Sequence, residues 1–193
     1  MEKQIVTQHT AIYCNENPWS LLRTGIEKLN PTKIFILVDT NTHEHCHELF
    51  IKKSGINTPV ETIIMSSGEK NKTIHTCMDI WTTLSEKGAD RSSLLINLGG
   101  GVVTDLGGFV ASTFKRGIEF INIPTSLLAM VDASIGGKNG VDLGMLKNQI
   151  GVVNNPRFVI VEPTFLNTLP KQEITSGFAE MLSDMGIDSV SLN

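Results

Sequence analysis

The segment NLGGGVVTDLGG, residues 97–108, places five glycines around one acidic residue, Asp105. It follows the apolar run 94–96, so the sequence predicts a buried strand that ends in a glycine turn. A helix is predicted to begin at Val102, and its unpaired N–H groups could bind a phosphate. The dinucleotide pattern G-x-G-x-x-G needs a glycine where Thr104 stands, so the strict match fails. A phosphate site and a plain tight strand-to-helix turn therefore both remain open.

Polar or glycine-rich residues also follow other predicted strands. Short apolar runs rich in Ile and Val predict strands over 33–39, 59–65, 92–98, 118–123 and 158–162. The first four are followed by Asp39-Thr40-Asn41, by Ser67 to Lys72, by the glycine turn and by Pro124-Thr125-Ser126. A carboxylate such as that of Asp39 can accept hydrogen bonds from a ribose diol, and Lys72 would bring positive charge to a phosphate. Four such strand ends indicate a nucleotide site better than any single loop does.

Helical patterns separate these strands. Pro18 is suited to the first turn of a helix that runs to about Leu29. Further helices are predicted over 41–55 and 71–88, and the second would bury a stripe of Ile74, Met78, Trp81 and Leu84. This alternation predicts an α/β fold, Rossmann-like, with a largely parallel sheet and helices on both faces. Ligands of such folds bind at the carboxyl ends of the strands.

One cluster of potential metal ligands lies outside this pattern. Residues 43–48, HEHCHE, contain three histidines and a cysteine, and His43 and His47 are neighbours on a helix. Zinc needs about four converging ligands, and His45 would point elsewhere. We therefore favour a solvated helix face over a metal site.

Bulk properties restrict the class of protein. The chain has 193 residues, of which 40% are hydrophobic and 19% charged, which suits one soluble domain. Its net charge of −4 and scattered basic residues indicate neither nucleic acid nor anionic membrane as a partner. The polar start MEKQIVTQHT is unlike a signal peptide, and three distant cysteines do not suggest a disulfide framework. We expect a cytoplasmic protein.

The segment 99–151 closely resembles the 3-dehydroquinate synthase family of the shikimate pathway. The resemblance includes the block GGGVVTDLGGFVA, the block IPTSLLAMVDASIGGKNG and the pair Lys147-Asn148. It extends backwards through SGEKNK and forwards through FLNTLP to SGFAEML, over roughly residues 33–182. Iron-dependent alcohol and glycerol dehydrogenases also contain GGGxxxD, but they usually follow the Pro-Thr step with a further glycine-rich turn. This chain reads LLAMVDASIGGK instead.

The resemblance implies an NAD-containing, zinc- or cobalt-dependent lyase. Its substrate would be the sugar phosphate 3-deoxy-D-arabino-heptulosonate 7-phosphate, and its products 3-dehydroquinate and phosphate. In that family a ring hydroxyl is oxidised with NAD, phosphate leaves by β-elimination, the ketone is reduced back, and an intramolecular aldol reaction closes the carbocycle. The resemblance also implies a homodimer.

The match assigns roles residue by residue. The implied cofactor residues are Asp39, Asn41, Gly68, Glu69, Lys72, Gly100, Gly101, Val102, Asp105, Thr125, Ser126, Lys138, Lys147, Phe165 and Thr168. The implied catalytic residues are Arg116, Asp132, Lys138 and Asn148, and Glu180 is the implied metal ligand. Arg116 would reach substrate phosphate in its own or a neighbouring subunit. Simpler roles stay open for some of them: Asp105 as a helix cap, Lys138 and Arg116 as surface charges, Glu180 as an exposed helix residue.

Four residues depart from the family pattern: Thr104 replaces a glycine, Ser126 a threonine, Asn139 a threonine and Asp142 an asparagine. Asp142 adds negative charge near an anionic substrate, which leaves the identity of the sugar phosphate open. Related cyclases that make a valiolone or an inosose are therefore an alternative.

The end of the chain departs further. We expect an NAD-binding α/β domain over 1–182, with the metal-binding helix starting near 171–182, and an atypical tail over 183–193. Ser183 stands where the family has a lysine. We expect the family's helical C-terminal domain, which supplies two histidine ligands, to be absent from this chain. We therefore expect the cofactor-binding half of a synthase, inactive alone. The alternative is a non-catalytic, NAD-binding short form.

Overall fold

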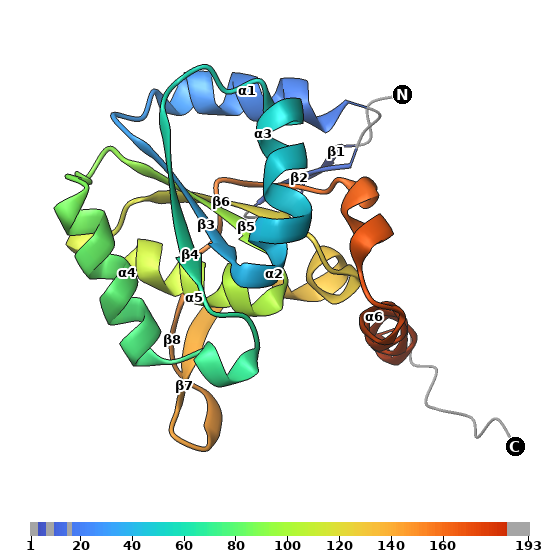
Figure 1. Ribbon diagram of the computed structural model, residues 1–193. Coiled ribbons are helices and arrows are strands. Elements are labelled where there is room, and N and C mark those ends of the chain that lie inside the picture. The colour runs from blue at the N-terminus through green and yellow to red at the C-terminus, as the bar shows by residue number, and fades with distance from the viewer. Residues whose placement is uncertain (1–3, 7–9, 15–16, 185–193) are drawn as a thin grey trace, which may run out of the picture.

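The computed structural model describes residues 4–6, 10–14 and 17–184, and it has one large sheet between two helical layers (Figure 1). The seven strands lie in the order β1-β2-β9-β6-β5-β3-β4, and all neighbours are parallel except β1 and β2. Their bounds are β1 (Gln4–Val6), β2 (Ala11–Tyr13), β3 (Ile34–Asp39), β4 (Val60–Met65), β5 (Leu94–Gly99), β6 (Glu119–Pro124) and β9 (Phe158–Ile160). The predicted α/β, Rossmann-like, largely parallel sheet is confirmed.

The central strands form because their side chains are apolar on both faces. All six residues of β5 are buried, and so are the first five of β3. Burying one such Leu or Ile side chain contributes about 1.5–3 kcal/mol, so continuous apolar runs favour the middle of a covered parallel sheet. The five predicted strands match β3, β4, β5, β6 and β9 to within about two residues at each end.

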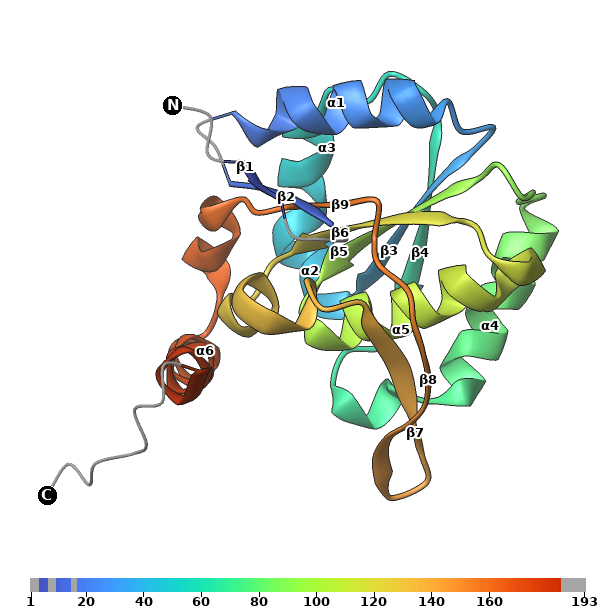
Figure 2. The same cartoon turned by 180° about the vertical axis from the view of Figure 1, so that it is seen from behind.

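Helices cover both faces of the sheet, as Figures 1 and 2 show from opposite sides. Helix α1 (Pro18–Leu29) and the helical segment made of α2 (Thr40–Thr42), a π-helical turn (His43–His47) and α3 (Glu48–Ser54) lie on one face. Their core side chains include Trp19, Leu22 and Phe50. Helices α4 (Ile74–Glu86) and α5 (Gly101–Thr113) cover the other face, with Cys77, Leu84 and Val110 in the core.

The predicted buried stripe of α4 is wrong in part. Met78 is 53% exposed, whereas Cys77 and Ile80 are buried with Leu84. Thr73 caps the helix by accepting a hydrogen bond from the backbone N–H of Thr76 at 3.3 Å, so α4 begins at Ile74 and not at 71. Cys77, Ile80 and Leu84 are spaced i, i+3 and i+7, so they share one helix face, and the small side chain of Cys77 takes the core position that the stripe gave to Met78.

A hairpin that the sequence did not predict packs against α5. It consists of β7 (Lys138–Leu143) and β8 (Leu146–Val153). The hairpin approaches α5 closely because Gly108 has no side chain: a Cβ there would overlap the buried side chain of Asn139. Six of the eight β8 residues are exposed, and the polar stretch 147–149 and Gly151 interrupt its apolar residues, so no strand pattern stands out.

The last helix, α6 (Lys171–Asp184), follows a short 3-10 helix, Pro163–Thr168. It begins at Lys171, and it includes residues 183 and 184, the first two of the predicted tail. Gly177 packs against the Leu127 side chain, so α6 contacts the turn that follows β6. The remainder of the predicted tail, 185–193, lies outside the described residues. None of the helices in the described part is long and apolar enough to cross a membrane.

Candidate active site at the carboxyl ends of the strands

The four polar strand ends meet at one edge of the sheet, as the sequence predicts. Strands β4, β3, β5 and β6 are consecutive neighbours and parallel, so their carboxyl ends share an edge. The chain passes from β3 outwards to β4 and returns to the other side of β3 as β5. This reversal makes a topological switch point between β3 and β5, the usual position of a ligand crevice in open α/β sheets.

The glycine turn links β5 to the N-terminus of α5. Gly100 caps the helix without a side-chain hydrogen bond, which leaves N–H groups of the first turn for a ligand. A Cβ on Gly100 would lie 3.3 Å from the Ser126 hydroxyl oxygen, tighter than an ordinary contact. Thr104, where the family has a glycine, is accommodated because its buried hydroxyl donates to the Gly101 carbonyl at 3.1 Å. The turn thus keeps a side-chain-free surface despite Thr104.

The end of β3 carries Asp39 as a helix cap. Its Oδ1 accepts a hydrogen bond from the backbone N–H of Thr42 at 2.8 Å, and the Thr42 hydroxyl accepts one from the Asp39 N–H at 2.9 Å. This reciprocal cap holds the carboxylate at the strand end with Oδ2 left to accept further bonds. Asn41, the second predicted residue here, is exposed in the first turn.

Lys72, which the sequence predicts to bring positive charge to a phosphate, is paired with groups of the protein itself. Its ammonium is buried and donates to Asp105 Oδ2 at 2.6 Å and to Asn148 Oδ1 at 2.7 Å. Asp105 therefore neutralises it within the protein. Burial raises the pKa of Asp105, against the opposing effect of the Lys72 charge. The pair fixes the carboxylate between the glycine turn and the hairpin.

A second ion pair links the segment after β4 to the hairpin, nearer the surface. Glu69 lies in a 3-10 helix, Glu69–Asn71, that follows Gly68, whose φ of +98° suits glycine. Its carboxylate lies 3.2 Å from the Lys147 ammonium on β8. Both side chains are substantially exposed, so the pair adds little stability but keeps two predicted cofactor residues adjacent.

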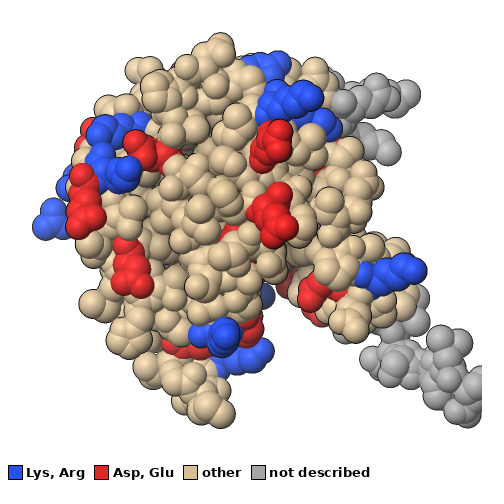
Figure 3. Space-filling view, in the orientation of Figure 1, with Lys and Arg blue, Asp and Glu red and all other residues tan. Residues whose placement is uncertain are grey.

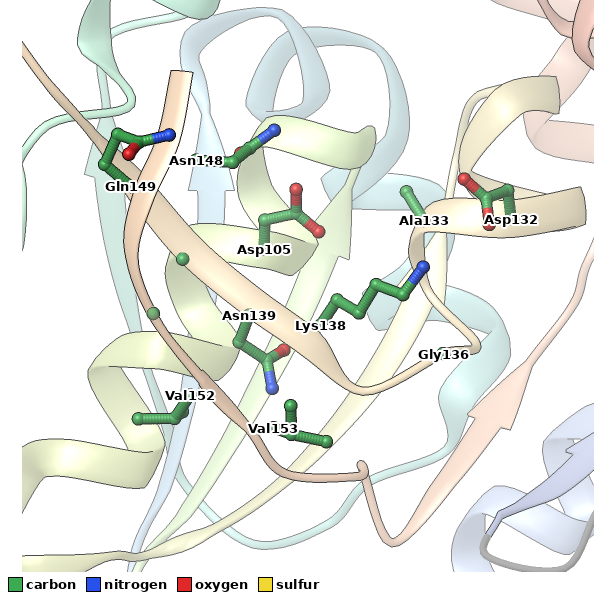
Figure 4. Close-up of a pocket in the computed structure, with 12 residues that line it drawn as sticks. Asp105, Asp132, Ala133, Gly136, Lys138, Asn139, Asn148, Gln149, Val152 and Val153 are labelled. Carbon is green, nitrogen blue, oxygen red and sulfur yellow. The ribbon is translucent and has the colours of Figure 1, made fainter. Parts of the chain in front are cut away.

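A pocket of about 510 Å³ opens between α5, the segment 132–136 and the hairpin (Figure 4). It brings together three of the four predicted catalytic residues, Asp132, Lys138 and Asn148, with Asp105. In Figure 4 the Lys138 ammonium points toward the side of the pocket formed by Asp132 and Ala133. The lining offers carboxylate, ammonium and amide groups, which suit the hydroxyls and phosphate of a sugar phosphate.

The sequence did not predict the hydrogen bonds that hold the segment 132–136, one wall of the pocket, against the sheet. Asn97 on β5 donates to Asn122 on β6 at 2.9 Å, and Asn122 donates to the Ser134 carbonyl at 3.1 Å. Ser134 follows the π-helical turn Ala129–Ala133 that carries Asp132. A buried amide chain therefore ties Asp132 to the sheet. Two asparagines inside predicted apolar strands were the available signal. Asn139 and Gln149 also line the pocket without having been predicted to do so.

Several predicted residues do not join the pocket. Arg116 lies past the carboxyl end of α5, in a left-handed conformation with φ +68°, just before β6 begins. The Phe165 side chain is fully buried in the core, 6.2 Å from the ring of Trp19, so any cofactor contact would have to come from its backbone. Thr168 is exposed and donates to the Phe165 carbonyl at 3.3 Å.

The remaining predicted cofactor residues line the turns around the same edge. Thr125 is buried after β6, and its N–H donates to the Gly99 carbonyl at 3.0 Å. The Ser126 hydroxyl accepts from the Ala129 N–H at 3.3 Å. Val102 is partly buried against the core behind α5. These contacts shape the edge and leave the glycine turn bare.

The described residues do not make up a metal centre. Glu180 lies partly buried on α6, and no group of three or more His, Cys, Asp or Glu side chains within residues 4–6, 10–14 and 17–184 is placed to hold an ion.

In the histidine cluster at 43–48, for which the sequence favours a solvated helix face, the His47 ring is 2.9 Å from the Thr62 hydroxyl, and His43 and His45 are exposed. Figure 3 shows acidic and basic side chains interspersed on the face in view.

The fold and site define a Rossmann-like α/β domain with a glycine turn at its switch point. The family description "3-dehydroquinate synthase N-terminal" matches residues 62–176, and the chain belongs to the 3-dehydroquinate synthase family. The 3-dehydroquinate synthase of Parabacteroides distasonis is 45% identical over 171 residues, covering 89% of this chain and 48% of the relative. That of Thermococcus kodakarensis is 45% identical over 166 residues, covering 85% and 47%. The chain thus spans about half the length of the curated relatives it matches.

Solved structures give the same fold. A 2-deoxy-scyllo-inosose synthase in complex with carbaglucose-6-phosphate, NAD+ and Co2+ is 25% identical with a TM-score of 0.82, over 96% of this chain and 51% of the other. ValA, a 2-epi-5-epi-valiolone synthase from Streptomyces hygroscopicus subsp. jinggangensis with NAD+ and Zn2+ bound, is 25% identical with a TM-score of 0.77, over 94% and 50%.

Proposed function

We propose that the carboxyl edge of the sheet binds NAD. The observation that carries this proposal is the bare glycine turn at the N-terminus of α5, placed at the switch point between β3 and β5. Backbone N–H groups there would hold the pyrophosphate, and the open Oδ2 of Asp39 would accept from a ribose hydroxyl. Similar solved structures that contain NAD+ support NAD as the ligand.

The proposed activity of the whole protein is that of a 3-dehydroquinate synthase, which converts 3-deoxy-D-arabino-heptulosonate 7-phosphate to 3-dehydroquinate and phosphate. Curated relatives of that name support it at 45% identity, against 25% for the inosose and valiolone cyclases. The related cyclases are therefore the weaker candidate. When bound, NAD would supply the acceptor and donor of hydride for a sugar carbon that is oxidised and then reduced.

The pocket residues have proposed roles in holding that substrate. Lys138 would pair with an anionic group of the sugar, and the Asn148 amide would donate to an oxygen. Asp132, tied to the sheet through Ser134, would accept from a ring hydroxyl. Asp105 would orient the cofactor side of the pocket through its fixed pair with Lys72. These groups orient the substrate against the cofactor, where small displacements strongly affect rate.

The metal is proposed to need residues beyond this chain. Catalytic zinc has about three protein ligands, and Glu180 is the one candidate that the family resemblance identifies in this chain. The residues described here do not suffice for the ion, so the other ligands would come from the half of the relatives that the chain does not match.

Arg116 is proposed to act in a neighbouring subunit of a homodimer. It does not line the pocket of its own chain, and it is exposed, with Lys115, in the loop before β6. Mixing Arg116→Ala subunits with Lys138→Ala subunits tests this, because a mixed dimer would regain one intact site. Recovery of activity on mixing is expected. No recovery beyond the two separate variants would contradict it.

The activity is tested by phosphate release from the heptulosonate phosphate, with NAD and zinc supplied. We expect turnover by the full-length protein and none by the 193-residue chain. Lys138→Ala should lower turnover strongly, whereas Lys87→Ala, at an exposed ion pair just past the C-terminal end of α4, should not. Turnover by the 193-residue chain near that of the full-length protein would refute the proposal that the activity needs the half of the relatives that this chain does not match.

A further inference from the structure

A closed ring of three hydrogen bonds joins Lys72, Asp142 and Asn148. The Asp142 backbone N–H donates to the Lys72 carbonyl at 2.9 Å. The Lys72 ammonium donates to Asn148 Oδ1 at 2.7 Å, and the Asn148 backbone N–H donates to Asp142 Oδ1 at 2.8 Å. The three residues come from the segment after β4, from β7 and from β8. The ring therefore fastens the hairpin to the strand edge where the proposed cofactor site lies.

Asn148 is held in an unusual backbone conformation. The pairing of β7 with β8 shifts between Val141 and Leu143, so Asp142 faces a bulge that contains Asn148. Asn148 has φ +53°, the left-handed region, which asparagine tolerates better than most residues but still at a cost. The bond from its N–H to the Asp142 carboxylate stabilises this bulge, because hydrogen bonds to a charged acceptor are stronger than those to a neutral one.

The ring also fixes which way the Asn148 amide points. An ammonium group can only donate, so the atom of the amide that faces Lys72 must be the oxygen. The Nδ2 group, with two N–H donors, is then left for the pocket that Asn148 lines. A ligand rich in oxygen acceptors, such as a phosphate or a polyol, suits these donors.

We propose that Asp142 is a positioning residue for Asn148. Its carboxylate holds Asn148 in the left-handed bulge, with the amide oxygen on Lys72 and the amide N–H groups directed to the ligand of the pocket. Asp142 itself does not line the pocket, and its negative charge is directed to the Asn148 N–H instead of the substrate. The proposal deepens the proposed function, and rests on it for the identity of the ligand.

Amide hydrogen exchange of Asn148 in the 193-residue chain tests the geometry directly. Asp142→Ala removes the acceptor, so the Asn148 amide should exchange about tenfold faster or more. Asp142→Asn keeps an Oδ1 acceptor and should stay within about threefold of the parent chain. Asp79→Ala, at an exposed carboxylate on α4, is the matched control and should change nothing. Unchanged protection in Asp142→Ala, or equal loss in Asp142→Asn, would overturn the proposal.

A second measurement remains decisive if Asp142→Ala unfolds. Glycine adopts the left-handed region without help, so adding Asn148→Gly should restore a folded chain and remove most of the loss in urea midpoint caused by Asp142→Ala. An equal loss in both backgrounds would refute the positioning role.

In the full-length protein, Asp142→Ala should lower kcat/KM for the heptulosonate phosphate about tenfold, mainly through KM, and Asp142→Asn should restore it. An equal loss of kcat/KM in both variants would count against the proposal. A full-length protein without any turnover would refute the proposed function, whereas the exchange and stability results would still decide the role of Asp142.

Discussion

Replacing Lys72 by methionine tests the buried ion pair at the centre of the site. Methionine has a similar length and no charge, so Lys72→Met removes the 2.6 Å contact with Asp105 Oδ2 and the bond to Asn148 with little change in packing. Only 5% of the Lys72 side chain and 18% of the Asp105 side chain are exposed. Asp105 would then be a largely buried carboxylate without a counter-charge.

The size of the effect depends on pH. Asp105 can escape the penalty by taking up a proton, and protonating a carboxyl group three pH units above its usual pKa costs about 4 kcal/mol. This sets the upper limit at pH 7, and some water contact reduces the expected loss to about 2–4 kcal/mol. At pH 5 the same limit is about 1.5 kcal/mol, so the variant should lose less stability in mild acid.

Urea unfolding of the chain at pH 7 and pH 5 measures both values. Adding Asp105→Asn to Lys72→Met removes the unpaired charge and should recover most of the loss at pH 7. A loss below about 1 kcal/mol at both pH values, or no recovery in the double variant, would show that the pair does not hold the two segments together.

Three further outcomes follow from the packing and the pKa shifts. Gly108→Ala should destabilise the chain by about 1–3 kcal/mol in urea unfolding, although alanine favours helix, because its Cβ would overlap the Asn139 side chain; a stabilised variant would contradict the close approach of hairpin and helix. One thiol per folded chain, the exposed Cys14, should react quickly with a disulfide reagent, since burial raises the pKa of Cys77 to about 12; two fast thiols would argue against this core. Burial lowers the pKa of His47 in the folded state, so its contribution to stability is present above the unfolded pKa of about 6.5 and is lost as pH falls below it. His47→Gln should therefore reduce the fall in the free energy of unfolding between neutral and acidic pH, measured in urea. An equal fall in the variant and the parent chain would exclude His47 as its cause.

The sequence predicted the parts of the fold that depend on local pattern. Continuous apolar runs such as 33–39 and 92–98 are stable only where both faces of a strand are buried, in a covered sheet. The sequence therefore predicted β3 and β5 and the polar residues at their ends. The alternation of these strands with helices then predicted that neighbouring strands run parallel. The meeting of Asp39 and the glycine turn at one edge follows from that order alone.

The contacts between distant segments could not be predicted in the same way. Strand β8 is mostly exposed, and a polar stretch interrupts its apolar residues. The hairpin is held by Asn139 against Gly108 and by the ring of bonds at Asn148, and neither contact leaves a periodic signal. Lys72 shows the same limit. Its position after β4 placed it at the right edge, but its ion pair with Asp105, 33 positions further along the chain, leaves no local pattern in the sequence.

The central claim, that the carboxyl edge of this sheet binds NAD, is tested most directly by calorimetric titration of the folded chain with NAD. We predict measurable binding, weaker than in a full-length relative, that Asp105→Ala weakens further and that His45→Ala, at an exposed side chain, leaves unchanged. A chain that is folded by circular dichroism and amide exchange, yet gives no heat of binding with NAD, would contradict the account.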